Sequence, residues 1–191
     1  GRPDMVCPND DERTLHNVTK PPYTVLFICS GNSARSIFAE ALLNQLGEGK
    51  FRAFSAGTRP GSKLNDYAID ILNRNGLDTS TLRAKHISEF QTTDAPQMDF
   101  IFTVCDAAAA EECAPWPGQP MTAHWGVPDP VKATGTDAEK GLAFAKAFSD
   151  LHRRIETSRL ALDSQLLRRS SIAIELASSG LMDPAASLIV V

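Results

Sequence analysis

Residues 23–36 read YTVLFICSGNSARS, and this stretch determines the fold that we expect for the chain. Its first six residues are rich in β-branched and aromatic side chains, which is typical of a buried strand. Gly31 and Asn32 interrupt the strand, and apolar residues between Ile37 and Leu46 then recur on one face of a helix. The sequence therefore predicts a strand, a short loop and a helix in direct succession.

The alternation of strands and helices continues along the chain. Thr136 and Glu139 form a candidate capping box at the start of a long helical pattern. Strands that alternate with helices predict an α/β domain with a parallel sheet, whose ligands bind at the carboxyl ends of the strands. The further strands are expected at residues 51–56, 100–104 and 121–124, and the further helices at residues 64–74 and from residue 136 to beyond residue 155.

The composition is that of a globular protein with one domain and additional length at both ends. Of the 191 residues, 42% are hydrophobic and 22% are charged, which is enough for a substantial core. The net charge of -4, without a long basic run, argues against nucleic acid and membrane surfaces as partners. We expect a flexible leader at residues 1–22, a globular domain at residues 23–160 and a C-terminal helical extension at residues 161–191.

Targeting signals and cysteine content both favour a cytoplasmic protein. No apolar stretch approaches the roughly 18 residues that cross a bilayer, and residues 1–20 lack the apolar segment of a signal peptide. Four cysteines, Cys7, Cys29, Cys105 and Cys113, are too few for a disulfide scaffold in a chain of this length. In a reducing compartment, cysteines are more often inert, catalytic or metal-binding than joined in structural bridges.

The loop after the first strand has the composition of an oxyanion site. A loop of the form Cys-x5-Arg between a strand and a helix directs its backbone N–H groups inward at the helix N-terminus. The guanidinium of Arg35 matches two oxygens of a phosphate-like group. Gly31 and Asn32 supply backbone freedom, and Asn32 also braces the loop. The residues expected to hold the oxyanion are Ser30, Gly31, Asn32, Ser33, Ala34, Arg35 and Ser36.

Cys29 is the candidate nucleophile of this loop. The inward N–H groups and Arg35 are expected to lower the pKa of its thiol from about 8.5 towards neutrality, and the Ser36 hydroxyl could donate a hydrogen bond to the thiolate. The alternative is a buried cysteine at a strand end with a surface arginine nearby by chance. The preceding strand, the internal glycine and the following serine and helix favour the functional interpretation.

Residues 25–36, followed by Ala39 and Glu40, resemble the low-molecular-weight protein tyrosine phosphatases and the arsenate reductases that share their fold. The resemblance extends over about residues 24–159. It implies an α/β fold with a four-stranded parallel sheet flanked by helices, in agreement with the pattern above. Ala34 departs from a frequent form of the motif, in which a second cysteine precedes the arginine, so this loop lacks a neighbouring thiol.

Asp129, between Pro128 and Pro130, is the candidate general acid. A thiolate that attacks a tetrahedral oxyanion needs an acid to protonate the departing oxygen. On the residues alone, a turn aspartate before a proline is the simpler interpretation; the resemblance implies the acid. Residues 124–126 resemble the reductase branch, with His124 and Trp125 expected to pack the loop. Val131 replaces the aromatic residue usual in the tyrosine phosphatases, which points away from a protein substrate.

Cys105 and Cys113 form the second cysteine motif. Cys105 follows a predicted strand and is therefore expected at the same sheet edge as Cys29. The alanine-rich segment between Cys105 and Cys113 could be a helix, which would separate them by about 10 Å. A disulfide needs Cα atoms within about 7 Å, so pairing would require the segment to unwind or loop out. By spacing alone, two ordinary buried cysteines are the simpler interpretation.

The resemblance to the reductases implies a thiol relay. Cys29 attacks arsenate, Cys105 attacks Cys29 and releases arsenite, and Cys113 attacks Cys105 to leave a disulfide for an external thiol reductant. Thioredoxin is the expected reductant in preference to glutaredoxin, and arsenate or phosphate the expected oxyanion. Cys7 has no predicted role. The predicted function is thus a thiol-dependent arsenate reductase. The alternative is a phosphatase of phosphotyrosine or small phosphomonoesters; a non-catalytic anion-binding module would require a defective loop.

No metal and no bound cofactor are expected. Cys105 and Cys113 lack a closely spaced partner pair, and His86 and His124 show no zinc-ligand spacing. Some members of the family bind potassium beside the loop, and three of its contact positions match this chain. Lys85 stands at the position of the last carboxylate, where its ammonium group removes the need for another cation. The three matching positions are Asn32, Glu40 and Ser55.

Overall fold

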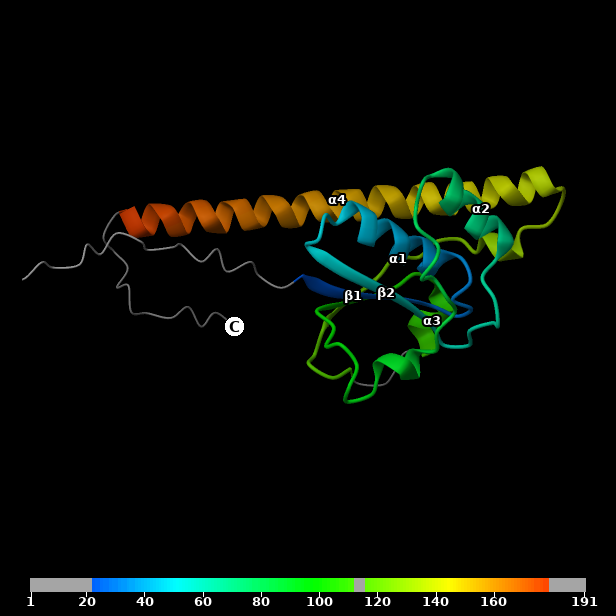
Figure 1. Ribbon diagram of the computed structural model, residues 1–191, viewed down its shortest axis with the longest axis horizontal. Helices are drawn as coiled ribbons and strands as arrows, with labels where there is room; N and C mark the ends of the chain where they lie inside the picture. Colours follow the sequence, from blue (N-terminus) through cyan, green and yellow to red (C-terminus); the bar gives the residue numbers. More distant parts are fainter. Residues whose placement is uncertain (1–21, 112–115, 179–191) are drawn as a thin grey trace, which may run out of the picture.

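The computed structural model describes residues 22–111 and 116–178, and four parallel strands form its sheet. The strand order is β2-β1-β3-β4, with helices packed around the sheet (Figure 1), so the predicted fold class is confirmed. Cys29 pairs with Gly57, and Ile28 pairs with Thr103. The ends of three strands therefore meet at one edge. The strands are β1 (Tyr23–Cys29), β2 (Phe51–Gly57), β3 (Phe100–Thr103) and β4 (Met121–His124).

The described residues also form four α-helices and two short 3-10 helices, of which one α-helix and one 3-10 helix follow the last strand and the others lie between strands. Figure 1 shows α4 running alongside α1 over the sheet, with α3 on the other side. The 3-10 helices were not predicted, because three or four residues are too few to show a helical period. The helices are α1 (Arg35–Leu46), α2 (Asp66–Arg74), α3 (Asp106–Glu111) and α4 (Asp137–Ser178), and the 3-10 helices are η1 (Ile87–Phe90) and η2 (Pro130–Lys132).

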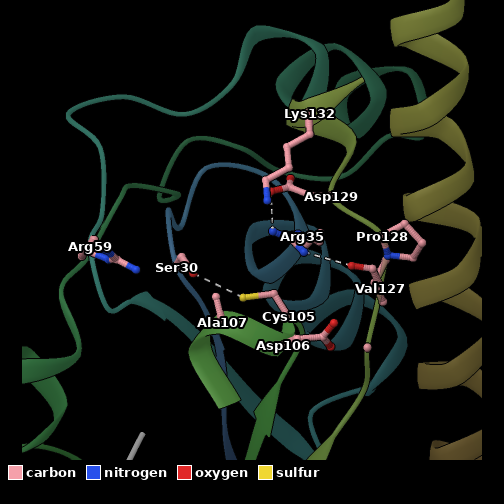
Figure 2. Close-up of a pocket in the computed structure, with 11 residues that line it drawn as sticks. Ser30, Arg35, Arg59, Cys105, Asp106, Ala107, Val127, Pro128, Asp129 and Lys132 are labelled. Atoms are coloured by element: carbon pink, nitrogen blue, oxygen red, sulfur yellow. Dashed lines mark hydrogen bonds and ion pairs between the residues drawn. The ribbon is translucent and has the colours of Figure 1, made fainter. Parts of the chain in front are cut away.

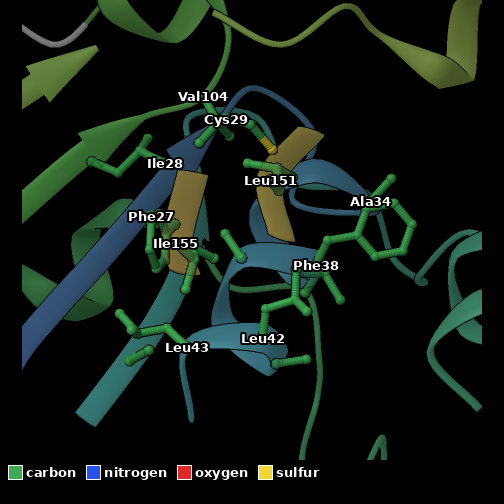
Figure 3. Packing of buried hydrophobic residues seen from close by; sticks show 14 of the residues in the cluster. Phe27, Ile28, Cys29, Ala34, Phe38, Leu42, Leu43, Val104, Leu151 and Ile155 are labelled. Carbon is green, nitrogen blue, oxygen red and sulfur yellow. The ribbon is translucent and has the colours of Figure 1, made fainter. Parts of the chain in front are cut away.

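The core fixes α1 between the sheet and α4. Phe27 and Ile28 of β1 are fully buried, and Phe38 of α1 packs edge-to-face against Phe148 of α4 with ring centroids 5.3 Å apart. Figure 3 shows Leu151 of α4 closing the same cluster. Burial on both sides holds α1 rigidly, and its first turn therefore provides a fixed support for the loop after β1.

Helix α4 begins at the predicted capping box. The backbone N–H of Thr136 donates to Glu139 Oε2 over 2.7 Å, and the N–H of Glu139 donates to Thr136 Oγ1 over 3.3 Å. The helix runs without interruption across the division predicted at residue 160, and that domain division stays a prediction. Residues 1–21, with Cys7 and nearly all of the predicted leader, lie outside the described part. No helix among the described residues combines the length and the apolar character that a membrane span requires.

Candidate functional site

The loop between β1 and α1 closes around the thiol of Cys29. Cys29 is 3% exposed at the last position of β1, and the backbone N–H of Asn32 donates to its Sγ over 3.1 Å. The hydroxyl of Ser36, in the first turn of α1, lies 3.0 Å from the same sulfur. The loop and the first turn of α1 thus each place a polar group at the sulfur. Binding of an oxyanion by the remaining backbone N–H groups of the loop stays a prediction.

The loop requires an unusual backbone conformation at Asn32 and a missing side chain at Gly57, whereas the sequence had indicated Gly31 and Asn32. Asn32 adopts the left-handed region with φ of 43°, as expected, whereas Gly31 does not. The close approach occurs instead at Gly57, the neighbour of Cys29 on β2. A Cβ atom there would lie 2.7 Å from the carbonyl oxygen of Ser30 and 3.0 Å from the Cβ of Asn32. Gly57 therefore leaves the room in which the loop lies.

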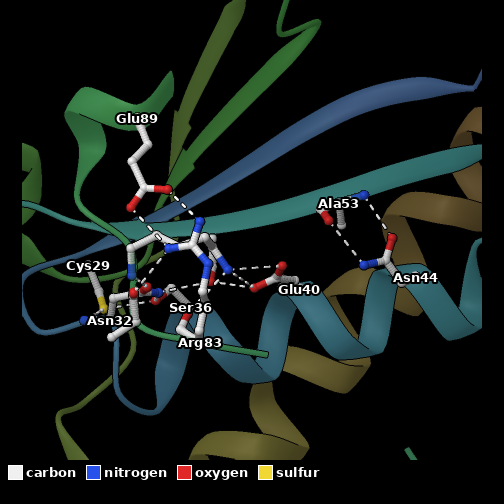
Figure 4. Close-up of polar contacts among 11 residues, drawn as sticks. Cys29, Asn32, Ser36, Glu40, Asn44, Ala53, Arg83 and Glu89 are labelled. Atoms are coloured by element: carbon white, nitrogen blue, oxygen red, sulfur yellow. Dashed lines mark hydrogen bonds and ion pairs between the residues drawn. The ribbon is translucent and has the colours of Figure 1, made fainter. Parts of the chain in front are cut away.

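A buried chain of hydrogen bonds joins the loop to α1 and β2 (Figure 4). The side-chain amide of Asn32 donates to Ser36 Oγ over 2.9 Å and to Ser55 Oγ over 2.8 Å. Asn32 Oδ1 accepts the backbone N–H of Lys85 over 2.7 Å, and Ser55 donates to Glu40 over 2.5 Å. Every polar atom of the Asn32 side chain is thereby engaged, which fixes its left-handed backbone.

Lys85 completes this chain with a buried ion pair. Its Nζ lies 3.0 and 3.2 Å from the two carboxylate oxygens of Glu40 and 3.2 Å from the carbonyl oxygen of Arg83. The two charged side chains are 7% and 10% exposed. The ammonium group of Lys85 therefore neutralises Glu40, as the family resemblance implied. The expectation that the protein binds no metal stays a prediction.

The pKa of Cys29 differs from the sequence-based expectation. Burial raises the pKa of this thiol above its ordinary value, because the thiolate loses its hydration. Hydrogen bonds with Ser36 and Asn32 and the charge of Arg35 lower it, but by less. The predicted lowering is therefore wrong for the protein alone. The sequence identified the groups that stabilise the thiolate and could not show how completely the sulfur is removed from water.

Arg35 joins the loop to the segment of the predicted acid (Figure 2). Its Nη2 lies 2.9 Å from Asp129 Oδ2, and its Nη1 donates to the carbonyl oxygen of Val127 over 2.9 Å. Asp129 caps η2 by accepting the N–H of Val131 over 3.2 Å. The guanidinium thus brings the Asp129 carboxylate to the anion loop, although the two residues are 94 positions apart in the sequence.

A cavity of about 780 Å³ opens over these groups. Arg59, from the segment after β2, and Lys132, from η2, add two cationic side chains that the sequence did not single out. Charged residues in loops resemble ordinary solvated residues, so no local signal identifies them. The cavity is lined by Ser30, Arg35, Arg59, Cys105, Asp106, Ala107, Gly126, Val127, Pro128, Asp129 and Lys132.

A second buried thiol, Cys105, lines this cavity, whereas Cys29 is not among the lining residues and directly precedes Ser30 in the loop. Cys105 follows β3, is 4% exposed and, like Cys29, is a free cysteine. Its Sγ lies 3.5 Å from the hydroxyl of Ser30 and accepts the N–H of Ala108 over 3.4 Å. The sequence-based placement of Cys105 at the edge where Cys29 lies is thus observed. Cys113 lies outside the described residues.

The amino-acid sequence is similar to a known family and to several of its members. The family model of the low molecular weight phosphotyrosine protein phosphatases matches residues 24–171. An arsenate reductase from Shouchella clausii is 32% identical over 132 residues, which cover 69% of this chain and 91% of the relative. Another from Bacillus subtilis is 30% identical, again over 69% of this chain and 91% of the relative.

Solved structures agree on the fold. The arsenate reductase from Archaeoglobus fulgidus is 24% identical and matches 71% of this chain and 98% of its own, with a TM-score of 0.55. At this identity the likeness concerns the fold alone. It agrees with the predicted fold. The family model and the relatives in sequence confirm the predicted family and the classification as an enzyme.

Proposed function

Since the chain belongs to the low molecular weight phosphotyrosine protein phosphatase family, we propose that it is a thiol-dependent arsenate reductase. The observation that carries the proposal is the second free thiol at the anion loop, Cys105, whose Sγ contacts the hydroxyl of Ser30 next to Cys29. Hydrolysis of a phosphate ester needs one nucleophilic thiol, whereas reduction of arsenate needs two electrons from a pair of thiols. A second thiol at this position therefore favours reduction.

In the first step of the proposed reaction, the sulfur of Cys29 attacks arsenic and forms a sulfur–arsenic bond. One arsenic–oxygen bond breaks, and the oxygen leaves as water after protonation by Asp129. Arg35 and the N–H groups of the loop hold the other oxygens. Because burial raises the pKa of Cys29, its proton must leave as the bond forms. A basic oxygen of the dianionic substrate is the acceptor that we propose.

The second and third steps transfer the electrons. The thiolate of Cys105 attacks the sulfur of Cys29, a disulfide bond forms, and the sulfur–arsenic bond breaks with its electron pair on arsenic, which leaves as arsenite. The thiolate of Cys113 then attacks the sulfur of Cys105 and releases the Cys29 thiolate. The product is a Cys105–Cys113 disulfide, which an external dithiol returns to two thiols by exchange.

The attack of Cys113 on Cys105 requires a change in the conformation of α3. This helix begins directly after Cys105, and its six residues rise by roughly 9 Å at 1.5 Å per residue. Disulfide-bonded Cα atoms lie within about 7 Å, so the proposal requires α3 to unwind or loop out for Cys105 to pair with Cys113. We also propose thioredoxin, in preference to glutaredoxin, as the reductant, because the chain resembles the thiol-relay reductases. The cytoplasm is the proposed location, because free thiols persist in a reducing compartment.

Purified protein assayed with arsenate and either a thioredoxin or a glutaredoxin system tests the proposal. The parent should form arsenite, and Cys105→Ser should form none because no thiol remains to displace arsenite from Cys29. Cys113→Ser should complete one turnover and accumulate a Cys29–Cys105 disulfide, which peptide mapping detects. An aryl phosphate serves as the second substrate, since water can hydrolyse a phosphocysteine without Cys105 or Cys113.

The alternative function is a phosphatase of phosphotyrosine or small phosphomonoesters. Cys29, Arg35 and Asp129 would serve that reaction equally. Val131, which follows the Asp129-Pro130 pair, is 51% exposed and offers a small aliphatic surface in place of an aromatic ring. Rapid hydrolysis of the aryl phosphate, with no arsenite under either reductant, would make this alternative the correct one.

A further inference from the structure

His124, the last residue of β4, contacts both the end of β3 and the start of α3. Its Nδ1 lies 2.8 Å from the hydroxyl of Thr103 at the end of β3. Its Nε2 lies 3.0 Å from Asp106 Oδ1, and Asp106 is the first residue of α3. This geometry suits the tautomer in which Nδ1 accepts from Thr103 and Nε2 donates to Asp106. Figure 2 shows Asp106 beside Cys105 at the start of α3.

The surroundings hold His124 in this place. The N–H of Trp125 donates to the carbonyl oxygen of Thr103 over 2.7 Å, and the Trp125 ring lies 4.4 Å from the ring of Phe102. A Cβ atom at Gly126 would lie 3.2 Å from His124 Nε2 and 3.4 Å from Asp106 Oδ1. A larger residue at position 126 would press on the hydrogen bond. The sequence predicted that both residues pack the loop, and Trp125 does so. His124 in addition joins β4 to β3 and α3 by its two hydrogen bonds.

Helix α3 needs an anchor of this kind. A helix of six residues does not persist in water without tertiary contacts, because nucleation costs more than so few hydrogen bonds return. Ala108 is fully buried and secures the middle of α3, whereas Asp106 is exposed except for its bond to His124. The wound first turn in turn holds Cys105, whose sulfur accepts the N–H of Ala108.

We propose that Thr103, His124 and Asp106 form a clamp that keeps α3 wound and thereby positions the thiol of Cys105 at Ser30 until arsenite has been released. His124 is a positioning residue in this scheme and takes no part in bond making. The purpose that we assign to the clamp depends on the proposed relay, in which α3 unwinds or loops out before Cys105 pairs with Cys113. The effect of the clamp on Cys105 in the reduced protein depends only on the observed hydrogen bonds.

The clamp is tested first without arsenate, by the rate at which iodoacetamide modifies Cys105 in the reduced full-length chain. Asp106→Ala and Thr103→Val each remove one bond, and Cys105 should react about fivefold faster, the factor expected when one hydrogen bond is lost from a local opening equilibrium. Asp106→Asn and Thr103→Ser keep an acceptor and a hydroxyl and should react like the parent. Mass spectrometry of the cysteine peptides distinguishes Cys105 from the other thiols.

Asp70→Ala is the matched control, because it removes a bond of similar length, 2.9 Å to Arg74, from the surface of α2. It should leave the Cys105 rate unchanged. In a second measurement, Thr103→Val should slow arsenite release in a single turnover about fivefold relative to aryl-phosphate hydrolysis. A structural defect shared by both reactions would slow the two together.

The outcomes separate the clamp from the proposed function. A parent that forms no arsenite refutes the reductase, and the iodoacetamide rates still decide whether the clamp holds Cys105. Equal Cys105 rates in the parent, Asp106→Ala and Thr103→Val would overturn the clamp, even if the protein reduces arsenate rapidly. It would also be overturned if Asp106→Asn reacted as fast as Asp106→Ala, since the hydrogen bond would then not be the cause.

Discussion

Replacement of Lys85 by methionine should destabilise the protein strongly, because it leaves a buried carboxylate without its cation. The ammonium of Lys85 contacts both oxygens of Glu40, at 3.0 and 3.2 Å, and both side chains are at most 10% exposed. Methionine keeps most of the volume, and the backbone N–H of residue 85 can still donate to Asn32. The substitution therefore removes the charge and little else.

The expected loss in the free energy of unfolding is about 3–5 kcal/mol, the range observed when one partner of a buried pair is removed. After the substitution, Glu40 retains only the hydroxyl of Ser55 as a donor among its described hydrogen bonds. Neutralising both partners, in Glu40→Gln/Lys85→Met, should recover most of the loss, because no isolated charge is then buried. Urea unfolding followed by tryptophan fluorescence measures the difference between the three proteins.

Lys63→Met is the control for this prediction. Lys63 pairs with Asp66 at 3.6 Å on the surface, where its side chain is 79% exposed, so the loss should stay below about 1 kcal/mol. If Lys85→Met were no less stable than Lys63→Met, the buried pair would not support the loop as described. Aryl-phosphate hydrolysis should fall in Lys85→Met and return in the double variant, since Glu40 acts on Cys29 through Ser55 and Asn32.

Three further predictions concern the reacting groups and their support. Asp129→Asn should lower turnover by about 10²–10⁴-fold while phosphate still inhibits, and parent-like turnover would exclude Asp129 as the acid. Gly57→Ala should cost about 1–3 kcal/mol, measured in urea, because its Cβ would lie 2.7 Å from the Ser30 oxygen. Burial raises the pKa of the folded Cys29 thiol above its ordinary value of about 8.5. The unfolded chain therefore ionises first, and stability should fall as pH rises beyond about 8.5. Cys29→Ser should lack that part of the decline in thermal melts.

The strand, loop and helix at the start of the domain were predictable because each depends on local sequence. The strand at residues 23–29 is a continuous apolar run, and the turn residues after it leave few conformations for the loop. The second strand was found from its alternating pattern at residues 51–56, and the third from its β-branched and aromatic residues. The fourth, at residues 121–124, is exposed and has no such pattern, so its prediction rested on its place before the loop of Asp129. The order β2-β1-β3-β4 was not predicted from the residues, because pairing depends on contacts between segments that are far apart in the sequence.

Parts of the site that depend on such contacts were missed. Gly57 looks like any glycine at a strand end, and its importance arises from its register beside Cys29. Asp106 and His124 are 18 positions apart and carry no common motif, so their bond could be recognised only after β3 and β4 had been placed side by side. Arg59, after β2, and Lys132, in η2, likewise reach the cavity from two segments that are far apart in the sequence.

The error about the pKa of Cys29 has a physical origin that bears on the proposed mechanism. The sequence counted the groups that favour a thiolate, and those groups are present, but burial of the sulfur raises the pKa of Cys29 by more than they lower it. Arg35, one of these groups, also directs both of its terminal nitrogens at the segment of Asp129. An oxyanion in the loop would compete with Asp129 for the same guanidinium. Release from Arg35 would free the Asp129 carboxyl group to turn toward the departing oxygen, where a general acid must lie. We therefore expect substrate binding itself to prepare Asp129 as the acid while the substrate takes the proton of Cys29.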